Sequence, residues 1–134
     1  SLALGLMAAS PVGAFTAING LHVQPTGQKG QFEVISSGGA GPRQIWCASA
    51  QFAHLGLRQR GQTRIFIAKG LSPSATVQGR KSVIFTVAPS AELRDGPRLG
   101  SNGNYSVSLR KIGFNLSLDH AEGFCEDVYN DIYD

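Results

Sequence analysis

The alternation of apolar and polar positions divides most of the chain into short strands. Two-residue periodicity between Gly-, Pro- and Ser-rich turns predicts strands at 15–24, 31–36, 63–69, 82–87 and 105–116, with a possible break at Gly113. The segment 82–87 reads SVIFTV and is the most apolar of these, so we expect it in the centre of a sheet. The segment 89–104 is rich in Pro, Gly and Ser and predicts a long excursion between strands.

Helical periodicity replaces this alternation at 42–58. Pro42 suits a first helical turn, and an apolar face of small residues follows, formed by Ile45, Ala48, Ser49, Phe52, Ala53 and Gly56. Such a face favours close packing on a sheet. The opposite side carries Gln44, Cys47, Gln51, His54 and Arg58. Because a structural cysteine is normally buried, we expect another element to cover this second side.

A second helix is predicted to begin after Ser117, an N-cap residue, with Asp119 in its first turn. Its apolar stripe consists of Leu118, Ala121, Cys125, Val128 and Ile132. Cys125 lies in the middle of that stripe and is the candidate to cover Cys47. The sequence therefore predicts an α+β fold, with a mostly antiparallel sheet of about five strands and two helices joined by a Cys47–Cys125 disulfide.

The two cysteines match neither a zinc-binding spacing nor a CxxC redox motif. A single disulfide is typical of an oxidising compartment, so we expect a secreted or periplasmic protein. The segment 1–17 agrees with export, because a short apolar run followed by small residues is typical of a signal peptide.

A second interpretation of 1–17 is an apolar arm that docks on the protein. Residues 2–9 would then pack on their own domain or on a second copy, giving a homodimer. The run is too short to span a membrane. In both interpretations, residues 18–134 form a single α+β domain.

Charge is distributed unevenly along the chain. Residues 43–111 carry eleven Lys and Arg against Glu92 and Asp95, whereas residues 112–134 carry six acids and no Lys or Arg. The acidic C-terminal helix could lie on the basic body and neutralise part of it, which is the simpler interpretation. The alternative is a basic surface for an anionic partner. If the strands at 82–87 and 105–116 pair, Arg80, Lys81, Arg110 and Lys111 would form an anion-binding cluster at one sheet edge.

Catalytic, metal and cofactor motifs are absent from the sequence. The three histidines have no metal-binding spacing, and Asp127, Asn130, Asp131 and Asp134 have helical spacing rather than that of a calcium loop. The Gly-rich loop at 36–41 precedes a helix but lacks the Lys-Ser/Thr of a phosphate-binding loop, so it is either a plain loop or an anion site. No cofactor is predicted.

These observations favour a non-catalytic binding or structural module of the cell envelope or periplasm. Its partner would be a protein, a polyanionic glycan or a lipid head group. Nucleic acid is disfavoured, because the basic residues are not interleaved with aromatic ones. The alternative is a small secreted hydrolase with a Ser/His/acid site near the 89–104 loop.

Overall fold

The protein is built on one antiparallel sheet. The computed structural model describes residues 13–126 and 128, and within them six strands are ordered β1-β2-β3-β5-β4-β6. Their bounds are Phe15–Thr16 (β1), His22–Pro25 (β2), Gln31–Ile35 (β3), Arg64–Pro73 (β4), Lys81–Thr86 (β5) and Asn115–Ser117 (β6). As predicted from its apolar sequence, β5 is internal, with β3 on one edge and β4 on the other.

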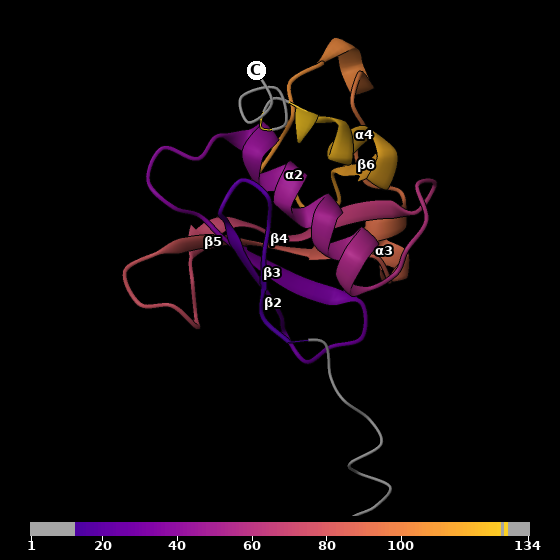
Figure 1. Cartoon of the computed structure of the whole chain (residues 1–134). Coiled ribbons are helices and arrows are strands. Elements are labelled where there is room, and N and C mark those ends of the chain that lie inside the picture. Colours follow the sequence, from indigo (N-terminus) through magenta and orange to yellow (C-terminus); the bar gives the residue numbers. More distant parts are fainter. Residues whose placement is uncertain (1–12, 127, 129–134) are drawn as a thin grey trace, which may run out of the picture.

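The helices lie mainly on one side of this sheet. Helix α2 (Pro42–Gln51) crosses one face and continues as a π-helical turn, η1 (Phe52–Gly56), while α4 (Leu118–Gly123) lies beside α2 (Figure 1). Two short elements, α3 (Ala91–Arg94) and the 3-10 turn η2 (Ser101–Gly103), interrupt the excursion before β6. The predicted α+β architecture is confirmed, with one more strand and one more short helix than expected.

Large aromatic residues fill the space between α2 and the sheet. Phe32 of β3 packs on Phe52 with ring centroids 4.9 Å apart, and Trp46 packs edge-on against Phe85 of β5 at 4.7 Å. All four side chains are fully buried. The Trp46 indole Nε1–H donates to the backbone oxygen of Ser108 at 2.8 Å, so this core also anchors a loop.

The polar side of α2 is covered by α4, as the sequence predicted. Cys47 and Cys125 form a disulfide with a Cα–Cα distance of 5.1 Å, and both residues are fully buried. Beyond the disulfide, His54 Nδ1 lies 2.9 Å from Glu122 Oε2. Helix α2 is therefore a middle layer between the sheet and α4.

The N-cap of α4 is also confirmed. Ser117 has an extended backbone conformation, and its Oγ accepts a hydrogen bond from the backbone N–H of His120 at 3.2 Å. We expect Ser117→Ala to lower the free energy of unfolding by about 1 kcal/mol, because the mutation leaves that N–H without its acceptor. Urea denaturation would measure the loss. Ser117→Asn, which can also cap, should retain most of the stability, as should Ser37→Ala at an exposed loop position. Equal losses for Ser117→Ala and Ser117→Asn would contradict a capping role.

The predicted strand at 105–116 is wrong except at its end. Only Asn115–Ser117 pairs with β4, and Tyr105–Ser108 form neither strand nor turn. Side-chain and loop contacts hold the turn that follows, around Gly113, in place. Asn115 is fully buried, and its Nδ2 donates to the oxygen of Gly113 at 2.9 Å. A Cβ on Gly96 would lie 2.0 Å from that same oxygen, so only glycine permits this close approach.

The described start of the chain belongs to the sheet. Phe15–Thr16 pairs with β2, and Ala17 is buried. The apolar run 2–9 lies outside the described residues, so a signal peptide, a docking arm and a homodimer all stay predictions. Within the described residues, no helix is long and apolar enough to cross a membrane.

Candidate functional site

The four basic residues predicted to form an anion-binding cluster do not lie at one sheet edge. Lys81 begins β5 opposite Pro73 of β4, and Arg80 precedes it in the turn. On the other side of β4, the oxygen of Leu109 accepts a hydrogen bond from the Leu71 N–H at 2.9 Å. The strand β4 therefore separates Arg80 and Lys81 from Arg110 and Lys111, because the predicted pairing between their strands does not form.

All four side chains are nevertheless exposed. Arg80 makes a long contact from Nη1 to the oxygen of Ser36 at 3.4 Å. The backbone N–H groups of Arg110 and Lys111 both donate to Ser108 Oγ, which fixes the backbone of these two residues and leaves their side chains in solvent.

The acidic helix does not neutralise these charges in the described part of the chain. Of its acids, Glu122 contacts His54, and this is the only contact between a carboxylate and a basic side chain within 4 Å among the described residues. The guanidinium of Arg43 lies over the Phe124 ring, 5.6 Å from its centroid, and thus contacts α4 through an aromatic rather than a carboxylate. Asp127, Asp131 and Asp134 lie outside the described residues.

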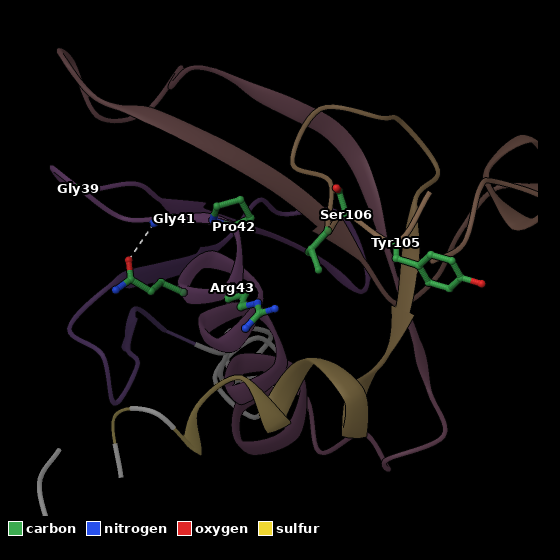
Figure 2. A pocket seen from close by; sticks show the side chains of 8 residues that line it. Gly39, Gly41, Pro42, Arg43, Tyr105 and Ser106 are labelled. Atoms are coloured by element: carbon green, nitrogen blue, oxygen red, sulfur yellow. Dashed lines mark hydrogen bonds between the residues drawn. The ribbon is translucent and has the colours of Figure 1, made fainter. Parts of the chain in front are cut away.

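A groove runs along the segment before β6. Its first part, about 650 Å³, lies between the start of α2 and residues 105–107. A second part, about 560 Å³, continues toward Arg110 and Lys111. The two parts share Pro42, Ser106 and Val107 and therefore adjoin, and together we call them the 104–111 groove. Figure 2 shows Pro42 and Arg43 on α2, with Ser106 across the opening and the Tyr105 ring extending away from the helix.

The groove wall is fixed at both ends. The oxygens of Ser108 and Leu109 accept hydrogen bonds from the core, the first from the Trp46 indole and the second from β4. At the other end, the Gly100 N–H donates to the Asn104 oxygen at 2.7 Å. Between these ends, the Tyr105 residue is 75% exposed to solvent and Val107 is half-buried. The groove is therefore formed before any ligand arrives.

The Gly-rich loop borders this groove. Gly39 and Gly41 line its first part, and the Gly41 N–H donates to Gln44 Oε1 at 2.8 Å (Figure 2). The capping residue Gly41 has no side chain to accept from the next backbone N–H groups of α2. The alternative of an anion site at 36–41 stays a prediction, and the structure adds that the loop and the 104–111 groove are neighbours.

The other face of the sheet buries one carboxylate of the described part of the chain. Glu33 of β3 is 3% exposed and accepts hydrogen bonds from Gln24 (3.1 Å), Ser74 (2.8 Å), Thr76 (2.6 Å) and Ser82 (2.5 Å). Burial by itself raises the pKa of Glu33, but the bonds from the three hydroxyls and the amide hold it below its ordinary value. This cage could not be predicted from the sequence, because two of its hydroxyls, Ser74 and Thr76, come from the turn after β4 and the third, Ser82, from β5, all distant from Glu33 in the chain.

No His joins a Ser and an acid by hydrogen bonds near the 89–104 loop in the described part of the chain, and the alternative of a hydrolase stays a prediction. The histidines lie elsewhere: His22 contacts Thr16, His54 contacts Glu122, and His120 packs near Phe124. No described His contacts a residue of the 89–104 loop through a hydrogen bond. Nor do three or more His, Cys, Asp or Glu side chains gather to hold a metal ion within the described residues.

Comparison of the chain with protein-family models, with curated proteins and with solved structures finds no match.

Proposed function

We propose that this protein is a small exported, non-catalytic module that binds an anionic ligand or an acidic protein partner through its basic surface. The observation that carries the proposal is the exposure of the basic side chains. Apart from the half-buried Arg64, every Lys and Arg is exposed, and none forms an ion pair with a carboxylate in the described part of the chain. Positive charge of this kind attracts anions and speeds their association.

Two of the acids already have partners within the fold and are less available to offset this positive charge. The Glu33 carboxylate is enclosed by its hydrogen-bond donors, and Glu122 contacts His54. The disulfide supports the export part of the proposal, since such bonds form and persist in oxidising compartments.

Binding of a polyanion should be measurable and sensitive to salt. We expect fluorescein-labelled poly-glutamate to bind in anisotropy titrations at 50 mM NaCl, and its affinity to fall about tenfold by 200 mM NaCl, because exposed charges are screened. Labelled poly-glutamine of the same length is the matched neutral control and should not bind. Absence of binding to poly-glutamate at 50 mM NaCl, or equal binding to both polymers, would refute the proposed function.

A further inference from the structure

The 104–111 groove combines a concave surface with several of the exposed basic side chains. Its lining includes three cations, namely Arg43 from α2 and Arg110 and Lys111 from the segment before β6. Among the residues that the structure describes, no Asp or Glu lines either part. A groove bordered by one sign of charge concentrates ligands of the opposite sign.

A second property of the groove concerns its backbone. Between the fixed ends, the N–H groups of Tyr105 and Val107 donate to no other described residue, and the oxygens of Tyr105, Ser106 and Val107 accept from none. The Ser106 N–H donates to Asn104 Oδ1 at 2.9 Å. The segment that lines the groove thus carries a short run of backbone donors and acceptors with no sheet partner. Such a run is a template for an added strand.

We infer that the 104–111 groove binds an extended acidic segment of a partner protein. The partner's backbone would pair with Tyr105–Val107, and its carboxylates would meet Arg43 at one end and Arg110 and Lys111 at the other. A polyanionic glycan would use the same cations but has no peptide backbone to pair with these groups. The backbone groups therefore favour a peptide over a glycan. The inference rests on the proposed function and names its ligand class and site.

The Arg43 guanidinium is already held for this role. Its contact with the Phe124 ring restrains the long side chain beside the groove, so less conformational freedom is lost when a carboxylate binds. Val107 and Pro42 supply apolar surface shared by both parts of the groove, against which alternate side chains of an extended peptide can pack.

The test uses an end-blocked heptapeptide of alternating Glu and Val, titrated into the 15N-labelled protein. We expect the amide signals of Tyr105 and Val107 to shift and their hydrogen exchange to slow. Arg43→Ala/Arg110→Ala/Lys111→Ala should weaken binding at least tenfold. Lys29→Ala/Arg60→Ala/Lys69→Ala removes equal charge from exposed positions outside the groove and should change affinity less than threefold. A Gln/Val heptapeptide is the neutral control.

A backbone variant separates a peptide from a glycan. Val107→Pro removes an N–H that donates to no other described residue, so it should weaken the Glu/Val peptide at least fivefold while native amide signals elsewhere are retained. A dextran sulfate oligomer should be unaffected by this change. If Val107→Pro leaves peptide affinity unchanged, or if the outer variant loses as much binding as the groove variant, the inference is wrong while the proposed function stands. If neither the peptide nor dextran sulfate binds, both fail.

Discussion

Replacing Cys47 and Cys125 together by Ala is expected to lower the free energy of unfolding by about 4 kcal/mol, the value for a long closed loop in the chain-entropy model. The bridge joins residues 78 positions apart, so the unfolded chain gains much conformational freedom when the bridge is removed. Both cysteines are fully buried in the folded protein. Calorimetry should show the melting temperature falling by more than about 10 °C.

The loss should be uneven across the molecule. Helix α4 has six residues, too few to be stable alone, and it is held by the disulfide and by its contacts with α2. Amide exchange in Leu118–Gly123 should therefore accelerate more than exchange in β3 and β5, which the sheet continues to hold.

Reduced wild-type protein is the matched control, because it lacks the bond but keeps both sulfur atoms in place. It should show a similar loss of stability. A loss under about 1 kcal/mol in the double variant, or uniform exchange changes in α4 and β5, would mean that packing alone secures α4 and that the bridge adds little.

The arrangement of sheet, α2 and α4 in layers could be predicted from the sequence, because strands and helices have different hydrophobic periodicities. The apolar positions of 42–58 placed Ile45 and Phe52 toward the sheet and left Cys47 on the other side, which required a second helix. Ser117 marked where that helix begins through a local hydrogen bond to His120. Local chemistry and spacing were sufficient for these features.

The 104–111 groove and the hydrogen-bond cage around Glu33 could not be predicted from local spacing. Residues 105–111 alternate like a strand, but Asn115, Gly96 and Trp46 hold this region by long-range contacts that leave Tyr105–Ser108 outside the sheet. The basic residues predicted at one edge lie on two sides of β4, since β5 and β6 each pair with β4 and not with one another.

One feature of the sequence could have drawn attention to Glu33, because it places a carboxylate inside a short apolar strand. Its meaning depends on where the turn after β4 folds. Pairing of β4 with β5 is irregular between Lys69 and Ser72, and the turn that follows brings Ser74 and Thr76 onto the carboxylate. No periodicity within 31–36 contains that information.

Glu33→Gln is expected to lower the free energy of unfolding at pH 7 by about 2 kcal/mol, in the range of hydrogen bonds to a charged group. The amide of Gln presents an NH2 toward donors that now point at a carboxylate, so part of the cage loses its acceptor. Urea denaturation at several pH values would measure the effect. Glu92→Gln, at an exposed position of α3, is the matched control and should change stability little.

The pH dependence gives the sharper outcome. Because the folded-state pKa of Glu33 is lowered, its ionised form stabilises the fold at pH values above the unfolded-state pKa of about 4.3. That contribution is lost as the pH falls through the lower folded-state pKa. The stability difference between wild type and Glu33→Gln should thus be constant above about pH 5.5 and shrink in acid. A difference that stays constant down to pH 3 would show that the hydroxyl cage does not depend on the charge of Glu33, and that Ser74, Thr76 and Ser82 bind the acid form equally well.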